Sequence, residues 1–392
     1  MANTNTPSIA PETTADRILG AAMALALVVG FGLAVAALAT PAARRRLDGT
    51  LNIASVLAGR TSAAVNYVTA HYLPIDDALR AAGGILRFRL FASGGPQVWV
   101  GRDDWLFLTE ELQPFPGAEA AMAFRVAALR HIQDRLAARG IGLLVAVVPD
   151  KARVMRNEMN GPRSSQAEAR YPELLRLLTA AKIPAVNLFD AFAGAQNTVD
   201  RDAGPLFYRT DTHWNQRGAA IAARAIAAAI TTPIDRSYKF RTEAEPAENE
   251  RAGDLLRLMS LDHVPDGLPV ELRPRADREH VEHTVPVEVA TARGLLDDGP
   301  KIEVALVGSS YSVNANFAGR LAEAIGAPVA NFASAGGGFA RAARGYLDSV
   351  TFRESPPKLM IWEIPERVMG QPINADDRSL NEALNSLPSS KN

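Results

Sequence analysis

Residues 303–312 read EVALVGSSYS, a short apolar run that leads into a Gly-Ser-Ser turn. Residues 143–148 read LLVAVV, and Pro149 ends this second run. Continuous apolar runs of this length, each ended by a turn residue, are typical of parallel strands that are buried on both faces. The two runs therefore predict an α/β fold built on a parallel sheet.

Helical and strand patterns alternate around these runs. Further strands are predicted at residues 185–188, 329–332 and 359–364, and helices at residues 118–139, 171–181, 215–230, 314–325 and 339–349. Asn215 is a candidate N-cap and Gly326 a candidate C-cap. The alternation predicts a doubly wound, mainly parallel sheet, and such sheets bind ligands outside the carboxyl ends of their strands.

Two segments depart from this alternation. Residues 98–108 (VWVGRDDWLFL) contain two apolar runs around a Gly-Arg-Asp-Asp turn, which predicts a hairpin. Residues 235–300 are charged and rich in proline, and we expect an irregular insertion with short strands rather than a second domain. We therefore predict one domain at residues 98–370 and a C-terminal tail at residues 371–392.

The N-terminal region contains one long apolar segment. Residues 18–40 carry no charge, and about 20 helical residues cross the hydrocarbon core of a bilayer, so we predict one transmembrane helix there. A buried globular helix is one alternative, and a cleaved signal peptide is another, because residues 37–39 (ALA) resemble a cleavage site. We expect a disordered tail at residues 1–17 and a helical stalk or cap at residues 41–97.

Charge and cysteine content limit the function classes. The net charge of -1 gives no electrostatic bias toward nucleic acid, and we expect no nucleic-acid partner. The chain contains no cysteine, which excludes disulfides, thiolate catalysis and Cys-ligated zinc. Arg17 precedes the apolar segment, whereas Arg44, Arg45 and Arg46 follow it, so the positive-inside rule alone favours a cytoplasmic C-terminal domain.

Candidate catalytic residues lie at predicted strand ends. Ser310 follows a strand and begins a helix, where backbone N–H groups can stabilise an oxyanion; a helix-capping serine is the alternative. Asp211 and His213 lie in a loop before a helix, so the carboxylate can fix the imidazole tautomer while the other ring nitrogen faces a nucleophile; a solvent-facing histidine is the alternative. Residues 333–338 (ASAGGG) can supply an oxyanion-binding amide or form a flexible turn, and they match no phosphate-binding pattern.

Other candidate ligands have simpler interpretations. His280 and His283 could bind a metal, but their charged, irregular setting favours exposed side chains, and we expect no metal site. Trp99, Trp105 and Trp214 could stack on sugars, although each is equally compatible with core packing.

Several motifs resemble those of the bacterial exopolysaccharide O-acetyltransferases related to the alginate acetylation proteins, which carry an SGNH hydrolase-like domain. The matching pieces are GRDDWLFL at 101–108, VPDK at 148–151, TDTHWN..G at 210–218, GDL at 253–255, GSSYS at 308–312 and WEIPER at 362–367. They extend over nearly the whole region after the stalk. The resemblance implies an SGNH hydrolase-like sheet, preceded here by the N-terminal transmembrane helix.

The resemblance also implies roles for individual residues. It assigns Ser310 as the nucleophile, His213 as the base and Asp211 as the acid that orients it, and it implies an oxyanion hole from the N–H groups of Ser310 and Gly336. Candidate substrate-binding residues are Tyr311, Trp214, Lys151 and Arg367. The Asp-x-His pair precedes the serine, as in the acetyltransferase branch, whereas ordinary SGNH hydrolases carry Asp-x-x-His after it. The third-block asparagine is missing, which leaves the oxyanion hole less well defined than the triad.

The implied reaction is acetyl transfer, through an acetyl-serine intermediate, to hydroxyls of an exopolysaccharide or cell-wall glycan, with no cofactor or metal. The implied partners are a polysaccharide acceptor and a membrane-bound O-acyltransferase that donates acetyl groups. The implied location is the inner membrane, with a single span and the catalytic domain in the periplasm, contrary to the count of flanking arginines. An acetyl esterase with the same triad and a non-catalytic glycan-binding scaffold of a polysaccharide secretion complex are the alternatives.

Overall fold

The protein is described by a computed structural model that covers residues 14–73, 75–197, 204–262, 264, 269–287 and 301–386. The predicted tails at residues 1–17 and 371–392 and the predicted insertion at 235–300 lie partly outside the described residues. Contacts within the chain define a smaller unit that ends at Gly83 and a larger unit that begins at Gly84.

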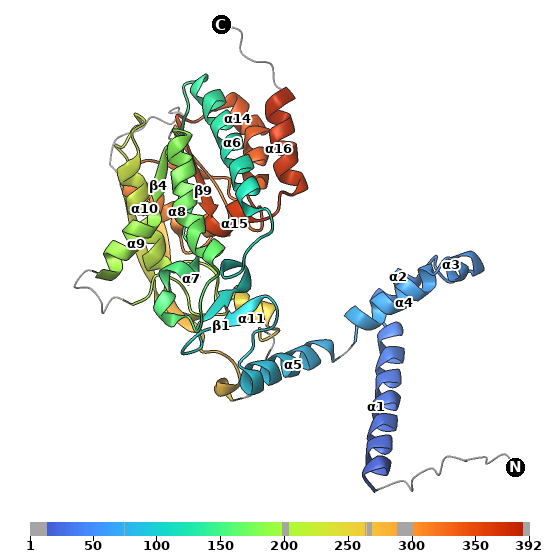
Figure 1. Ribbon diagram of the computed structural model, residues 1–392. Coiled ribbons are helices and arrows are strands. Elements are labelled where there is room, and N and C mark those ends of the chain that lie inside the picture. The colour runs from blue at the N-terminus through green and yellow to red at the C-terminus, as the bar shows by residue number, and fades with distance from the viewer. Residues whose placement is uncertain are drawn as a thin grey trace, which may run out of the picture. The chain divides into compact units, whose positions relative to one another are not determined.

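The smaller unit is helical (Figure 1). In α1 (Thr14–Leu38), the stretch Arg17–Leu38 has a mean hydropathy of 2.5 and is long and apolar enough to cross a membrane, a property that signal sequences share. The helices that follow are α2 (Pro41–Leu47), α3 (Ile53–Leu57), α4 (Arg60–His71) and α5 (Asp76–Phe91), and the division between the units falls within α5. One N-terminal apolar helix is therefore present, as predicted.

The larger unit is built on a five-stranded parallel sheet in the order β4-β3-β9-β7-β8. Its strands are β3 (Gly142–Val148), β4 (Ala185–Asn187), β7 (Val304–Val307), β8 (Val329–Asn331) and β9 (Leu359–Pro365). The two apolar runs that predicted the fold form β3 and β7, and β9 pairs with both of them in parallel. This confirms the predicted α/β class and the parallel sheet.

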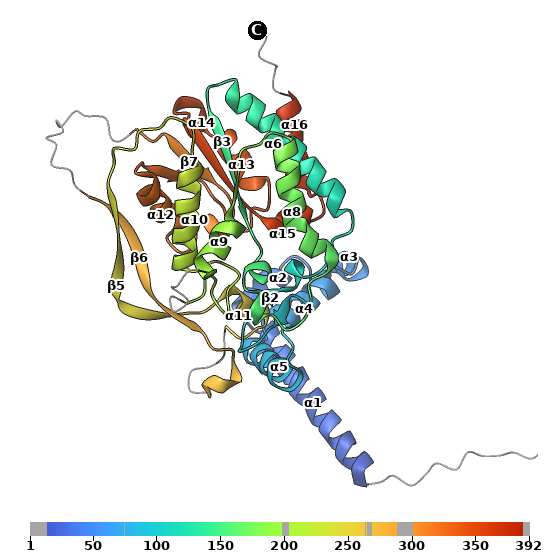
Figure 2. The same cartoon turned by 60° about the vertical axis from the view of Figure 1, so that its left-hand side comes forward.

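Helices cover both faces of the sheet (Figure 2). The helices on one face are α6 (Ala118–Ala137), α8 (Ser165–Ala180), α13 (Arg341–Leu347), α14 (Val350–Glu354), α15 (Glu366–Gly370) and α16 (Ala375–Ser386). The helices on the other face are α7 (Lys151–Val154), α9 (Leu188–Asn197), α10 (Gln216–Ala229) and α12 (Phe317–Ile325). In β3, Leu143 and Val145 join the first core, whereas Leu144 and Ala146 join the second. Alternate side chains point to opposite faces of a strand, so a strand covered on both sides is apolar throughout.

The predicted hairpin is present at the start of this unit. β1 (Val98–Val100) pairs antiparallel with β2 (Leu106–Leu108), and Trp99 faces Phe107 in the register. Asp103 and Asp104 adopt positive φ values of 47° and 64° in the turn between the strands. Aspartate tolerates this left-handed conformation better than most residues, which fits the Gly-Arg-Asp-Asp sequence of the turn.

Two segments are more regular than predicted. In the predicted insertion, β5 (Phe240–Arg251) and β6 (Asp277–Pro286) form a long antiparallel ribbon, and α11 (Asp254–Leu258) follows β5. The ribbon packs against α12, which covers one face of the sheet: the Thr242 hydroxyl donates to Glu323 of α12 at 2.6 Å, and Arg320 of α12 donates to Glu282 at 2.6 Å. In the predicted C-terminal tail, α16 packs against the main domain, and its buried Asp377 pairs with Arg125 of α6 at 2.5 Å.

Candidate active site

The nucleophile candidate lies in the turn after β7. Gly308 and Ser309 leave the strand, and Ser310 begins a short 3-10 turn at Ser310–Ser312. The first N–H groups of such a turn have no acceptor within it, so the Ser310 amide is available to a ligand. The Ser310 hydroxyl lies at the carboxyl end of the sheet, where doubly wound folds bind their ligands.

The Asp-x-His pair lies in a tight loop that precedes α10. Phe207 and Trp214 form an antiparallel bridge that closes the loop, and the Tyr208 amide donates to the His213 carbonyl at 3.2 Å. The side chain of Asn215 then accepts from the Gly218 amide and caps α10, as predicted. These contacts fix the backbone on both sides of the candidate base.

The structure brings Ser310, His213 and Asp211 together. The Ser310 hydroxyl lies 2.7 Å from His213 Nε2, and His213 Nδ1 lies 2.6 Å from Asp211 Oδ1. The same Asp211 oxygen accepts from the His213 amide at 2.9 Å. With Nδ1–H donating to the carboxylate, the unprotonated Nε2 is free to accept the serine proton, which is the geometry of general-base activation.

The carboxylate of Asp211 is held in its ionised form. Burial alone would raise the pKa of Asp211, but the hydrogen bond and charge of His213, together with Arg251, hold it well below its ordinary value. Arg251 Nε lies 3.6 Å from Asp211 Oδ2. An ionised carboxylate on Nδ1 stabilises the imidazolium that forms when His213 accepts a proton.

Lys151 is fully buried, and its side chain is hydrogen-bonded to the backbone of the Asp-x-His loop. Its ammonium donates to the carbonyls of Leu106 at 2.5 Å, Arg209 at 2.9 Å and Asp211 at 3.0 Å. Burial lowers the pKa of this amine to about 8. The predicted contact of Lys151 with substrate would require this side chain to leave its three carbonyl partners, whereas the structure gives it a role in holding the loop.

Tyr311 and Trp214 are also buried rather than lining a surface. The Tyr311 hydroxyl donates to the Thr212 carbonyl at 3.0 Å, and its ring packs 4.9 Å from His213 and 5.0 Å from Trp214. Burial raises the pKa of Tyr311 well above its ordinary value, so the hydroxyl keeps its proton and remains a donor. The two aromatic side chains hold the histidine ring in place and offer no surface to a substrate in this structure.

The remaining two predicted site residues, Arg367 and Gly336, differ in how exposed they are. Arg367 is 13% exposed, and its guanidinium lies 5.9 Å from the Tyr311 ring and 3.8 Å from Glu111. Gly336 is exposed, with φ of 68°, in the loop after β8. The Ser334 amide of this loop donates to the Gly308 carbonyl at 3.1 Å, so the loop lies beside the nucleophile turn. The oxyanion role of Gly336 stays a prediction.

Two acidic residues of the site had no role assigned from sequence. Asp254 accepts from the amide and hydroxyl of Thr212 at 2.7 and 3.0 Å. A side chain at Gly253 would meet the Thr210 carbonyl at 1.9 Å, which explains the glycine of the GDL motif. Glu363, from the WEIPER motif, accepts hydrogen bonds from the nucleophile turn. The motifs marked both residues, but only the fold shows their partners.

A metal is not needed to explain this constellation. Asp211, His213 and Asp254 offer ligand atoms within 4.8 Å of one another. However, both ring nitrogens of His213 already have partners, so a metal would displace either the carboxylate or the serine. His280 and His283 are exposed as expected, and each bonds to Glu245 of the ribbon.

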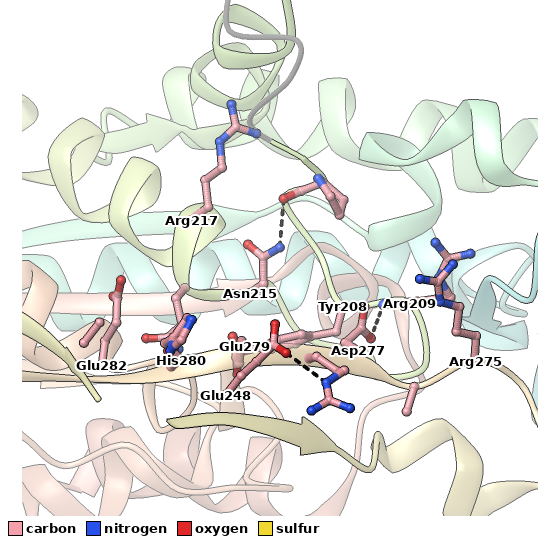
Figure 3. A pocket seen from close by; sticks show the side chains of 15 residues that line it. Tyr208, Arg209, Asn215, Arg217, Glu248, Arg275, Asp277, Glu279, His280 and Glu282 are labelled. Atoms are coloured by element: carbon pink, nitrogen blue, oxygen red, sulfur yellow. Dashed lines mark hydrogen bonds and ion pairs between the residues drawn. The ribbon is translucent and has the colours of Figure 1, made fainter. Parts of the chain in front are cut away.

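A polar pocket of about 720 Å³ lies between residues 205–217 and the β5–β6 ribbon (Figure 3). Its acidic side chains are engaged by donors of this chain, since Glu248 accepts from Arg278 at 2.9 Å and Glu279 accepts from the Tyr208 hydroxyl at 2.5 Å. Tyr208 belongs to the loop that carries the Asp-x-His pair, so the pocket adjoins that loop. The triad residues are not among those that line it in the described part of the chain.

Comparisons with known proteins agree with this architecture. Residues 98–366 match the family described as "SGNH hydrolase-like domain, acetyltransferase AlgX". The chain is 34% identical over 327 residues to "Probable alginate O-acetylase AlgJ" of Pseudomonas fluorescens, covering 82% of this chain and 80% of that protein. It is 36% identical over 289 residues to the protein of the same description from Pseudomonas putida, covering 72% of each chain.

Solved structures show the same relationship. The O-acetyltransferase domain of Pseudomonas putida AlgJ superposes with a TM-score of 0.64 at 33% identity, covering 74% of this chain and all of that domain. Pseudomonas aeruginosa AlgX superposes with a TM-score of 0.54 at 25% identity, covering 68% of this chain and 62% of that one.

Proposed function

The chain belongs to the family of SGNH hydrolase-like alginate O-acetylases represented by AlgX and AlgJ, and from this premise we propose that it is an O-acetyltransferase that uses Ser310 as its nucleophile. Asp211 and His213 complete the proposed triad. The observation that carries the proposal is the continuous hydrogen-bonded series from Asp211 through His213 to the Ser310 hydroxyl, at 2.6 and 2.7 Å.

The first half-reaction loads the enzyme. His213 Nε2 takes the hydroxyl proton of Ser310 while the serine oxygen attacks the acetyl carbonyl carbon of the donor. The carbonyl oxygen becomes an oxyanion, for which the Ser310 amide and the proposed Gly336 amide are the donors. The bond between the acetyl carbon and the donor then breaks, and the donor leaves with the proton from the imidazolium. Acetyl-Ser310 and neutral His213 remain.

The second half-reaction transfers the acetyl group. His213 takes the proton of an acceptor hydroxyl, whose oxygen attacks the acetyl carbon of acetyl-Ser310. The ester bond to the serine breaks, and the serine oxygen recovers the proton from the imidazolium. An acetylated sugar and the free enzyme result, and an attack by water instead of a sugar would give acetate.

Two assays test this proposal in sequence. The full chain in detergent should hydrolyse a chromogenic acetyl ester, and Ser310→Ala should abolish that turnover, which separates an enzyme from a glycan-binding scaffold. Addition of an oligosaccharide acceptor should then give an acetylated sugar detectable by mass spectrometry. Release of acetate with no acetylated sugar at saturating acceptor would identify an esterase instead.

The acceptor and donor follow from the relatives' names and from the chemistry of the site. We propose a polysaccharide acceptor of the alginate class, because the relatives are described as alginate O-acetylases. A serine enzyme on the far side of a membrane from acetyl-CoA needs acetyl groups delivered to it. A membrane-bound O-acyltransferase that exports acetyl groups fits that need.

We propose that α1 anchors the protein in the inner membrane by a single span, with the catalytic domain in the periplasm. The apolar stretch Arg17–Leu38 supports the anchor, and a polysaccharide acceptor outside the cytoplasm requires this orientation. Alkaline phosphatase fused after Asn392 should be active, because it folds only after export. An inactive, stably expressed fusion would refute the orientation, and a mature protein that begins near residue 40 by mass would identify α1 as a signal peptide.

A further inference from the structure

A single charged residue interrupts the apolar strand at the centre of the sheet. β9 reads LMIWEIP, and its Glu363 is 1% exposed. Burial of an ionised carboxylate is strongly unfavourable unless the charge is compensated by hydrogen bonds or a cation. Among the described residues, no lysine or arginine forms an ion pair with Glu363, so its hydrogen bonds are what compensate it.

Within the described part of the chain, the hydrogen bonds that the Glu363 carboxylate accepts all come from one turn. Glu363 Oε2 accepts from the Ser309 amide at 2.7 Å and from the Ser312 hydroxyl at 2.9 Å. The Ser309 hydroxyl lies 3.0 Å from both carboxylate oxygens. One buried side chain therefore holds the residues on both sides of Ser310, while the Ser310 hydroxyl itself bonds to His213.

The fit between the turn and the carboxylate is tight. A β-carbon at Gly308 would lie 2.6 Å from Glu363 Oε2, 2.9 Å from Glu363 Cβ and 2.9 Å from Ser312 Oγ. The Ser309 hydroxyl also accepts from the Tyr311 amide at 3.2 Å, so the bonds to Glu363 continue into the 3-10 turn. The glycine of the GSSYS motif is thus explained by the close approach of this carboxylate.

We propose that Glu363 is a positioning residue for the acetyl-transfer site: its carboxylate fixes the turn so that the Ser310 hydroxyl points at His213 and the Ser310 amide points at the oxyanion. The proposal rests on Ser310 being the nucleophile. Glu363 touches neither substrate nor the reacting atoms in this role. Glu363 acts through the backbone of the turn, so its loss is expected to lower kcat for a small ester and to leave the KM nearly unchanged.

The chemistry of the donors suggests a pair of variants. Glu363→Met keeps the approximate volume but accepts no hydrogen bond, so the turn loses its anchor. Glu363→Gln retains one oxygen that can accept from Ser309 and Ser312, and its amide can donate to the Ser309 hydroxyl. Recovery of activity in the glutamine variant therefore distinguishes hydrogen-bonded positioning from a requirement for the charge.

The experiment uses the full chain in detergent with three readouts. These are kcat and KM for a chromogenic acetyl ester, the rate at which a sulfonyl fluoride modifies Ser310 by intact mass, and thermal unfolding. For Glu363→Met we expect kcat and the modification rate to fall together by about 100-fold, with KM within about threefold of the wild type. For Glu363→Gln we expect both rates within about tenfold of the wild type.

A matched control separates positioning from loss of stability. Asp377 of α16 is another fully buried carboxylate, but it pairs with Arg125 of α6 at 2.5 Å and, among the described residues, makes no hydrogen bond to the nucleophile turn. Asp377→Leu should lower the unfolding temperature at least as much as Glu363→Met, with kcat per folded molecule within about threefold of the wild type. Should Glu363→Met not fold, Ser312→Ala removes one anchoring bond and is expected to lower kcat about three- to tenfold.

The outcomes are distinguishable. A wild type that neither turns over the ester nor reacts with the sulfonyl fluoride refutes the proposed function, and the positioning role falls with it. If the wild type is active and a folded Glu363→Met variant has an unchanged kcat, the positioning role alone is refuted. The same holds if Glu363→Met does not fold and Ser312→Ala has an unchanged kcat. Equal losses of kcat in Glu363→Met and Asp377→Leu would do the same, because they would reflect a loss of stability.

Discussion

Replacement of Lys151 with methionine is expected to weaken both the fold and catalysis. Lys151 Nζ is buried and donates to the carbonyls of Leu106, Arg209 and Asp211 at 2.5, 2.9 and 3.0 Å. Methionine fills a similar volume but has no donor, so three carbonyl oxygens lose this partner. Two of these carbonyls belong to the loop that carries the Asp-x-His pair, and the loop is expected to become mobile relative to Ser310.

The size of the stability loss follows from two opposing effects. Hydrogen bonds from a charged donor contribute about 1.5–3 kcal/mol each, so three contribute roughly 4.5–9 kcal/mol. Burial lowers the pKa of Lys151 from 10.5 to about 8, which corresponds to about 3.4 kcal/mol against the charged form. The difference predicts that Lys151→Met lowers the free energy of unfolding by roughly 1–6 kcal/mol at pH 7.

The pH dependence of this loss has a definite sign. As the pH rises, the folded protein loses the Lys151 proton near pH 8, whereas the unfolded chain keeps it to about its ordinary value of 10.5. Between these values the unfolded state binds more protons, so the contribution of Lys151 to stability rises with pH. The unfavourable free energy of burying the Lys151 ammonium has its full value below about pH 8 and decreases as the pH rises toward 10.5. The stability difference between wild type and Lys151→Met should therefore be larger at about pH 9.5 than at pH 7.

Chemical unfolding of the full chain in detergent at the two pH values measures this difference, and turnover of an acetyl ester measures the catalytic effect. Lys239→Met provides a control, because Lys239 is exposed, and its free energy of unfolding should change by no more than about 0.5 kcal/mol. A Lys151→Met variant as stable as the wild type at pH 7 would refute the anchoring role. A stability difference that shrinks as the pH rises would refute the lowered pKa.

Three further substitutions test the site and its backbone. Ser310→Ala should lower kcat for an acetyl ester by on the order of 10³-fold or more, and Ser309→Ala should cost much less; equal losses at unchanged unfolding temperature would mean that the wrong serine is assigned. Asp211→Asn should lower kcat by about 10⁴-fold. Because the pKa of Asp211 is depressed, the accompanying stability loss should be fully present above about pH 4 and should shrink progressively in urea melts as the pH falls further toward the depressed pKa. Gly308→Ala should lower both the unfolding temperature and kcat, because its β-carbon would lie 2.6 Å from a buried carboxylate oxygen, whereas Gly345→Ala, with open space around it, should lower neither.

The strands were the most predictable part of the fold. Residues 143–148 and 304–307 read as continuous apolar runs because helices cover both faces of the sheet, and they form β3 and β7. The triad residues could be found from their motifs, but the reason given for one of them was wrong. Ser310 lies in the turn after β7, at the carboxyl edge of the sheet, as predicted, whereas the Asp-x-His loop follows α9 and not a strand of the sheet. The loop nevertheless brings His213 to 2.7 Å from the Ser310 hydroxyl.

The groups that support the site could not be predicted from local pattern. Lys151 and Glu363 are charged, and charged residues are ordinarily exposed, so sequence suggests a cleft for Lys151 and nothing specific for Glu363. Their partners come from segments far apart in the chain and depend on the strand order, which alternation does not specify. The length of the ribbon was underestimated for another reason: only short strands were expected there, because β5 and β6 are largely exposed and charged and therefore lack an apolar period.

The position of β9 connects these buried charges to catalysis. β9 is the last strand in the described part of the chain, but it lies between β3 and β7, so its carboxyl end reaches both halves of the site. Glu363 holds the nucleophile turn that follows β7. Glu366 accepts from the amide of Asp150, which follows β3, at 3.0 Å, and the next residue, Lys151, holds the Asp-x-His loop. The carboxyl end of β9 therefore contacts both the turn that carries Ser310 and the segment that holds the Asp-x-His loop. Because proton transfer tolerates misplacement of only about 0.5 Å, apolar replacements of these buried acids could preserve the sheet and still lose the register between serine and histidine.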